Sequence, residues 1–169
     1  MPNPRLRTGL SIVAAVALAD QATKWIVTGW LEEAGRGLPV TGFFNFVLVH
    51  NRGASFGMFQ TDSPWGPWLL AAFTFVVIAG LLVWMARTPE PGLTVALGLI
   101  IGGAAGNGAD RIAHGHVIDF LDFHVAGYHW PAFNLADSAI TIGVAIVLYG
   151  SLIGGRSGRT VSGPRGGST

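Results

Sequence analysis

The chain has 169 residues, of which 50% are hydrophobic and only 11% are charged. Soluble domains carry roughly 25% charged residues, so this composition argues against a soluble globular fold. The formal net charge of +1 leaves no dense basic surface, which excludes a protein that binds nucleic acid by charge. Because the chain has no cysteine, disulfides, thiolate nucleophiles and cysteine-ligated metals are also excluded.

Four apolar stretches dominate the chain, and they lie at residues 9–31, 67–86, 93–109 and 132–153. A helix needs about 20 residues to cross the hydrocarbon core of a bilayer, and each stretch approaches this length. We therefore predict an all-α membrane protein, with a single domain of four transmembrane helices over residues 1–155. The remainder, 156–169, is too poor in apolar residues to fold and is predicted to be a disordered cytoplasmic tail.

The basic residues indicate how the helices cross the membrane. If four helices alternate, six arginines fall on one side, namely Arg5, Arg7, Arg87, Arg156, Arg159 and Arg165. The positive-inside rule places this side, and with it both termini, in the cytoplasm. An A-x-A pattern at Ala17 to Ala19 would also suit a cleavable signal peptide, but three further spans favour a retained first helix.

Two loops on the outer side follow from this topology, at residues 32–65 and 112–131. The first contains an aromatic and β-branched run at 43–49, bounded by glycines, which predicts a strand or short hairpin at the membrane interface. Amphipathic rings favour the headgroup layer, and four tryptophans lie near the outer ends of the helices: Trp30, Trp65, Trp68 and Trp130.

Polar side chains from several segments are predicted to reach the same outer depth. They are Asp20 and Lys24 in the first helix, Asn51 and Arg52 in the first loop, Asn107, Asp110 and Arg111 in the third helix, Asp119 and Asp122 in the second loop, and Asn134 and Asp137 about one turn inside the fourth helix. Such groups are costly in apolar helices unless they are paired or hydrated, so each is a candidate for function. The i,i+4 spacing of Asp20 and Lys24 also suits a plain ion pair at a helix end.

Two sequence patterns have plain alternatives to a chemical role. Gly98, Gly102 and Gly106 recur every four residues, which predicts a face for close helix packing. Residues 53–57 match the G-x-S-x-G pattern of serine hydrolases, so an intramembrane serine protease that uses Ser55 and a histidine stays open. The five histidines lack a recognisable metal-ligand spacing, and interfacial positions facing water explain them.

Asp119 and Asp137 are the more informative pair. Two carboxylates at a partly desolvated site can share a proton, because ionisation of one raises the pKa of the other. One can then deprotonate water while the other protonates the carbonyl oxygen or leaving nitrogen of a peptide, as in an aspartyl protease. Spacing alone leaves Asp110 and Asp122 open as members of the pair, and solvated loop carboxylates remain the alternative.

Five short motifs occur in order along nearly the whole chain. They are DQATK at 20–24, NRGASF at 51–56, GNGADR at 106–111, VIDF at 117–120 and FNLADS at 133–138. Together they resemble bacterial lipoprotein signal peptidase, also called signal peptidase II. The resemblance implies four helices with a small extracytoplasmic β-cradle and a short outer helix. It also implies an intramembrane aspartyl endopeptidase that cleaves the signal peptide from diacylglyceryl-modified prolipoproteins just before the lipidated cysteine.

The resemblance also assigns roles to single positions of this chain. Asp119 and Asp137 match the catalytic pair. Residues that support the site or bind the substrate match at Asp20, Lys24, Asn51, Gly53, Asn107, Arg111 and Asn134. Ser55 falls where the family motif accepts a small residue. We expect no metal ion and no cofactor, prolipoprotein substrates and membrane lipid as partners, and a monomer in the bacterial inner membrane.

Three other functions fit the same residues and differ in what they predict. A small transporter or channel could use intramembrane ionisable groups as an ion path, and it would leave prolipoprotein uncut. A non-catalytic membrane chaperone would bind the substrate equally well with both aspartates changed. Metal-assisted hydrolysis would stop in a strong chelator.

Overall fold

The computed structural model describes residues 4–35, 37–53 and 65–157 of the chain. Its helices are α1 (Pro4–Glu33), α2 (Gly66–Arg87), α3 (Pro91–His114) and α4 (Leu135–Ser157), and each is long and apolar enough to cross a membrane. The four predicted spans are confirmed as helices. α3 extends beyond the predicted end at 109, because its polar last turns find partners inside the protein. α4 takes in residues 156 and 157, and the rest of the predicted tail, 158–169, lies outside the described residues.

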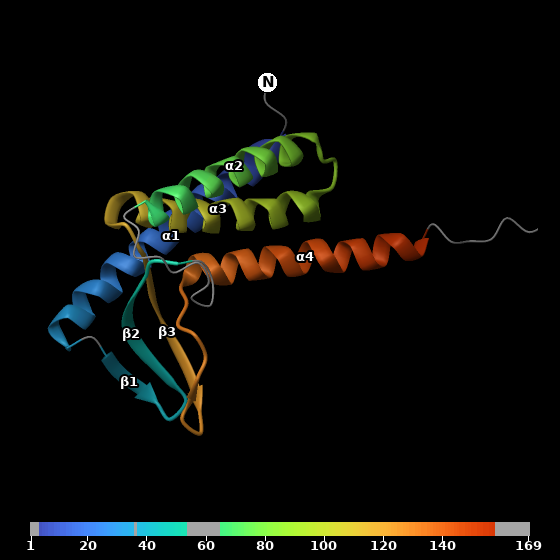
Figure 1. The fold of residues 1–169 in the computed structure, drawn as a ribbon. Helices are drawn as coiled ribbons and strands as arrows, with labels where there is room; N and C mark the ends of the chain where they lie inside the picture. Colours follow the sequence, from blue (N-terminus) through green and yellow to red (C-terminus); the bar gives the residue numbers. More distant parts are fainter. Residues whose placement is uncertain (1–3, 36, 54–64, 158–169) are drawn as a thin grey trace, which may run out of the picture.

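α3 lies at the centre of the bundle and packs against α1, α2 and α4 (Figure 1). Glycines allow these backbones to approach closely: a Cβ atom at Gly102 would lie 2.7 Å from the Val16 side chain of α1. A Cβ atom at Gly103 would overlap the Ala136 carbonyl group of α4. The predicted packing face is confirmed, and it holds the polar end of α3 between α1 and α4.

Four strands form one antiparallel sheet in chain order: β1 (Gly37–Thr41), β2 (Phe44–Asn51), β3 (Val117–Val125) and β4 (Tyr128–His129). β1 and β2 confirm the hairpin predicted around 43–49. The sequence pattern predicts a loop over 112–131, and β3 and β4 correct this. Gly115, whose φ of 72° is easily adopted only by glycine, ends α3 and turns the chain into β3.

The sheet is attached to the bundle through the C-terminal part of α1. Val27 and Leu31 of α1 form a buried apolar cluster with Phe120 of β3, and Phe46 and Leu48 of β2 pack against it. The combination of four helices with a small antiparallel sheet is therefore confirmed. A short outer helix is not found among the described elements, and residues 54–64 of the first loop lie outside them.

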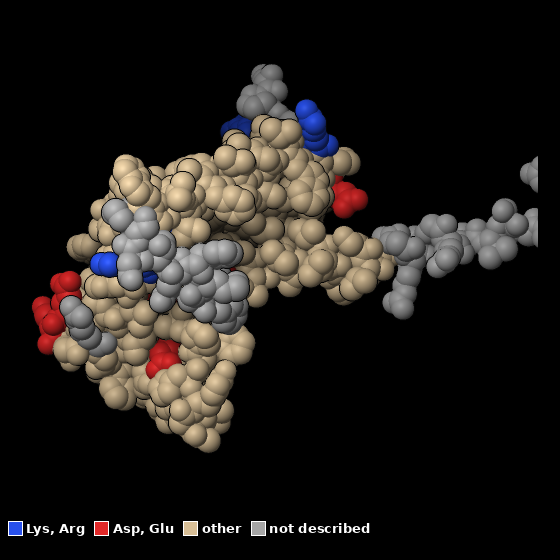
Figure 2. All heavy atoms as spheres, in the orientation of Figure 1, with Lys and Arg blue, Asp and Glu red and all other residues tan. Residues whose placement is uncertain are grey.

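The helices expose apolar side chains on their outer faces. Trp25, Val76 and Leu152 are each more than 70% exposed, as expected of a surface that faces lipid. Figure 2 shows one side of the molecule. On this side the charged side chains gather near the ends of the helices and in the sheet, with uncharged residues between them. The four tryptophans predicted to lie near the outer helix ends, Trp30, Trp65, Trp68 and Trp130, are all at least half exposed.

Candidate active site

Asp119 lies on β3 with its side chain turned into the protein, and only 2% of the residue is exposed. One carboxylate oxygen accepts a hydrogen bond from Nδ2 of Asn51 at 3.0 Å, across the β2–β3 pair. The other accepts from Nδ2 of Asn134 at 2.8 Å. Burial and the nearby charge of Asp137 raise the pKa of Asp119 from 3.8 to about 7, although both amide donors oppose this shift.

Asp137 lies in the first turn of α4. Its Oδ1 accepts a hydrogen bond from Nδ2 of Asn107 at 2.8 Å, and its Oδ2 accepts from the backbone N–H of Asn134 at 3.3 Å. The Asn134 side-chain oxygen accepts in return from the Asp137 backbone N–H at 2.9 Å, a reciprocal arrangement known as a capping box. Asn134 thus precedes the first residue of α4, which corrects its predicted place one turn inside.

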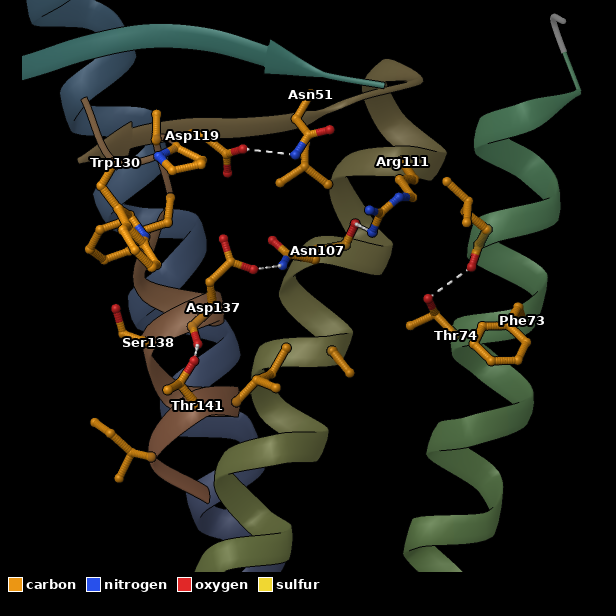
Figure 3. A pocket seen from close by; sticks show the side chains of 18 residues that line it. Asn51, Phe73, Thr74, Asn107, Arg111, Asp119, Trp130, Asp137, Ser138 and Thr141 are labelled. Carbon is orange, nitrogen blue, oxygen red and sulfur yellow. Dashed lines mark hydrogen bonds between the residues drawn. The ribbon is translucent and has the colours of Figure 1, made fainter. Parts of the chain in front are cut away.

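Both carboxylates face the same cavity, whose volume is about 940 Å³. Figure 3 shows Asp119, Asp137 and Asn107 on one side of this cavity, with Phe73 and Thr74 of α2 on the other. The two aspartates are joined through asparagine side chains, because Asn134 binds Asp119 and also donates to Oδ1 of Asn107 at 3.1 Å. Asn107 completes the connection by donating to Asp137.

The structure separates this pair from the other candidate carboxylates. Asp122 lies on β3 further from the helices, where it accepts from Asn45 at 2.8 Å and contacts His129 at 2.8 Å. Burial alone would raise the pKa of Asp122, but these two contacts lower it overall. Asp110 bonds to Lys24 and Gln21. Neither Asp110 nor Asp122 is among the residues that line the cavity in the described part of the chain.

The predicted ion pair in α1 is confirmed, and it extends toward the site. Lys24 lies 2.8 Å from Asp20, and both are almost fully buried. The Lys24 ammonium also donates to Oδ1 of Asn107 at 2.9 Å. The pair is therefore part of the network around the aspartates rather than an isolated lock at a helix end.

Arg111 connects α3 to the first loop. Its guanidinium donates to the Gly53 carbonyl oxygen at 2.9 Å and to the Asn107 carbonyl oxygen at 3.3 Å. Gly53 in turn donates its N–H to the Asn51 side chain at 3.0 Å, and this keeps the Asn51 amide directed at Asp119. The catalytic and supporting positions that the family motifs mark therefore lie within one hydrogen-bonded network, whereas the candidate Asp122 lies outside it and no hydrogen bond among the described residues joins Arg52 to it.

Other participants are not predicted by the sequence. Gln21 donates to Asp110 at 2.8 Å and to the Gly106 carbonyl oxygen at 3.1 Å, and its place one turn before Lys24 on the same helix face is the signal that could have found it. Phe73 and Thr74 line the cavity from α2, where an apolar helix gives no sign of such a role.

The serine and histidine alternatives receive no support from the described residues. Ser55 lies outside them, and no histidine is among the residues that line the cavity there. His50 and His116 have ring centroids 4.2 Å apart at one end of the sheet, and His124 stacks on His129 at 4.8 Å. Within the described ranges, histidine, aspartate and glutamate side chains form no group of three arranged to hold a metal ion.

The sequence profile described as Signal peptidase (SPase) II matches residues 12–153. The chain belongs to the signal peptidase II family. A lipoprotein signal peptidase of Rhodopseudomonas palustris (strain TIE-1) is 51% identical over 156 residues, which cover 88% of this chain and 94% of the relative. Another, of Azoarcus sp. (strain BH72), is 47% identical over 148 residues, which cover 87% and 84%.

Two solved structures, each described as a bacterial membrane enzyme determined by the in meso method, share the fold. One, at 2.3 Å resolution, has a TM-score of 0.75 with 28% identity over 94% of both chains. The other, at 1.9 Å resolution, has a TM-score of 0.70 with 30% identity over 86% of this chain and 92% of that chain. As a member of this family the protein is a peptidase, and its membership supports cleavage of prolipoprotein signal peptides. Its four apolar helices fit a multi-pass membrane protein.

Proposed function

We propose that this member of the signal peptidase II family is an intramembrane aspartyl endopeptidase with Asp119 and Asp137 as its catalytic pair. It removes the signal peptide from prolipoproteins by cutting just before the cysteine that carries a diacylglyceryl group. The observation that carries the proposal is that both carboxylates face one cavity and are joined through the side chains of Asn134 and Asn107.

In this proposal Asp119 is the proton donor and Asp137 is the base. A pKa of about 7 keeps about half of the Asp119 carboxyl groups protonated at neutral pH, where an ordinary aspartate would be ionised. Asp137 is less buried and lies in the first turn of α4, where backbone N–H groups stabilise a carboxylate. Two acids in different environments can thus take opposite roles, as general acid–base catalysis requires.

The reaction balances with water as the only co-reactant. Asp137 takes a proton from water as the water oxygen attacks the peptide carbonyl carbon, and Asp119 gives its proton to the carbonyl oxygen. The carbon–nitrogen bond then breaks as Asp137 passes its proton to the leaving nitrogen. A hydroxyl proton of the intermediate returns to Asp119, which restores the starting state.

The walls of the cavity suit an apolar peptide. Leu70 and Phe73 line the cavity from α2, and Ile140 and Ile142 line it from α4, so a signal helix placed in it would contact aliphatic and aromatic side chains. Its scissile bond would have to unwind to meet the carboxylates, because the carbonyl of a helical residue is already hydrogen-bonded. Anchoring of peptide and lipid in the bilayer would supply much of the orientation.

The same proposal sets the protein in the bacterial inner membrane as a monomer. The sheet and the active site lie on the outer side, near the outer leaflet, and both termini lie in the cytoplasm. The support is the position of six arginines along the sequence, at the start of α1, at the end of α2, and at or beyond the end of α4, which all fall on one side if the four helices alternate.

Purified protein in lipid–detergent micelles, given a synthetic prolipoprotein fragment with a diacylglyceryl cysteine, tests the proposal. We expect wild type and Ser55→Ala to cut it before that cysteine, and folded Asp119→Asn and Asp137→Asn to lose cleavage by at least about 1,000-fold. Cleavage at the normal rate by folded Asp137→Asn would refute the pair. An uncut substrate together with solute movement across sealed vesicles would favour a transporter.

A further inference from the structure

A buried cluster of three charged residues lies beneath the catalytic pair. The Lys24 ammonium lies 2.8 Å from an Asp20 oxygen and 2.8 Å from an Asp110 oxygen. All three residues are at most 2% exposed. One cation between two anions leaves a net negative charge, so neutralisation does not explain the cluster, and buried ion pairs rarely stabilise a fold more than apolar residues would.

Each carboxylate of this cluster also binds the backbone next to a catalytic aspartate. Oδ1 of Asp20 accepts from the N–H of Ala136 at 3.0 Å, and Ala136 immediately precedes the aspartate of α4. Oδ2 of Asp110 accepts from the N–H of Ile118 at 3.2 Å, and Ile118 immediately precedes the aspartate of β3. The same cation thus links the two backbone positions that carry the catalytic side chains.

Lys24 makes a third contact that acts on a side chain. It donates to Oδ1 of Asn107, whose Nδ2 donates to Asp137. A reversed amide would set its NH₂ group against the ammonium and its oxygen against the carboxylate, and both contacts would be repulsive. Lys24 therefore fixes which end of the Asn107 amide meets Asp137.

We infer that Asp20, Lys24 and Asp110 form a clamp that sets the separation and orientation of the two catalytic carboxylates. Asp110 positions the strand that carries Asp119, and Asp20 positions the helix that carries Asp137. The inference rests on the proposed function, because it assigns these residues as positioning residues for that reaction. Displacements of about 1 Å at reacting groups can cost on the order of 100-fold in rate, so such a clamp would act mainly on kcat.

A matched pair of variants at Asp110 tests the clamp. Asp110→Asn keeps an oxygen that can accept from the Ile118 N–H, whereas Asp110→Leu has a similar volume and no acceptor. We expect Asp110→Asn to keep kcat within about 10-fold of wild type and Asp110→Leu to lose about 100-fold or more, with KM changed less than about 3-fold in both. Thr94→Val, which removes the hydroxyl of another buried polar residue of α3 far from the site, should change neither value.

A second variant tests the cation without leaving two unpaired carboxylates. Lys24→Met combined with Asp110→Asn keeps the net charge of the cluster at its wild-type value. The groups that face Asp119 are Asp137 from α4, Arg111 from α3 and Lys24 from α1, and the Lys24 charge holds the pKa of Asp119 lower than burial alone would. The alkaline limb of the kcat profile should therefore move to higher pH, by up to about one unit.

The outcomes separate this inference from the proposed function. Equal kcat for folded Asp110→Asn and Asp110→Leu, or an unshifted pH profile in the double variant, would overturn the clamp. If Asp110→Leu fails to fold, the pH profile of the double variant decides alone. An inactive wild type, or an active Asp137→Asn, would instead overturn the proposed function.

Discussion

The carboxyl group of Asp119 makes the stability of the fold depend on pH. Burial, with the charge of Asp137, raises its pKa from 3.8 to about 7. An acid with a higher pKa in the folded state ionises more readily in the unfolded chain, so the fold loses stability as the pH rises from about 4 to about 7. About three pH units at 1.36 kcal/mol each give roughly 4 kcal/mol, so we expect a loss of about 2 to 4 kcal/mol.

Asp119→Asn should remove this dependence. Below about pH 4 the variant should be less stable than wild type by about 1 kcal/mol, because its amide nitrogen cannot accept from Asn51 or Asn134. At pH 9 it should be more stable than wild type by about 1 to 3 kcal/mol while being inactive. Unfolding of both proteins in the same micelles, followed by tryptophan fluorescence from about pH 3 to about pH 9, measures the difference.

Asp122→Asn is the matched control on the same strand. The contacts of Asp122 with Asn45 and His129 outweigh its burial and lower its pKa, so its ionised form stabilises the fold above about pH 4. Asp122→Asn should therefore be less stable than wild type at pH 9, whereas Asp119→Asn should be more stable than wild type at that pH. Stability curves for wild type and Asp119→Asn that run parallel from pH 4 to 9 would refute the reasoning.

Four further outcomes follow from the packing and the network. Gly102→Leu should lower the free energy of unfolding by about 1 to 3 kcal/mol in denaturation experiments, whereas Gly150→Leu, which enters open space, should change it little. Asn134→Ala should cost about 1 kcal/mol through the lost helix cap, and kinetics on the folded protein should show cleavage at least about 100-fold slower. Phe73→Ala should raise KM for the lipidated peptide more than it lowers kcat, because this side chain lines the cavity away from the carboxylates. Cleavage measured in excess EDTA should match the untreated rate, and its loss on chelation would favour metal-assisted hydrolysis.

The helices could be predicted because lipid demands long apolar runs, and the sequence carries four of them. The ends of the helices could not be predicted in the same way. α3 continues through Asn107, Asp110 and Arg111 because these side chains find hydrogen-bond partners inside the protein, and the sequence does not show those partners. β3 was equally hard to predict from pattern. Its residues are buried on both faces near the helices and only partly so toward β4, so the alternation typical of a one-sided strand is absent.

The composition of the site was more predictable than its connections. Polar residues within apolar segments stand out in the sequence, and the motifs indicate Asp119 and Asp137. Spacing does not show that Asp122 turns to His129 or that Asp110 turns to Lys24, because both choices depend on how β3 leaves the end of α3. Those contacts exist only after the sheet has paired and docked on α1.

Gly106 shows that helix packing and site chemistry cannot be separated in this bundle. A Cβ atom there would overlap the Asp20 carboxylate, so the glycine leaves the space that this carboxylate occupies. Asp20 needs that position to accept from the Ala136 N–H at the start of α4. A residue of the small-residue face, which by sequence alone indicates only close packing, thus makes room for the group that holds the helix carrying Asp137. Gly106→Ala should therefore reduce kcat more than Gly98→Ala, although both add one methyl group between α1 and α3. Equal losses in the two folded variants would show that the glycines serve packing alone.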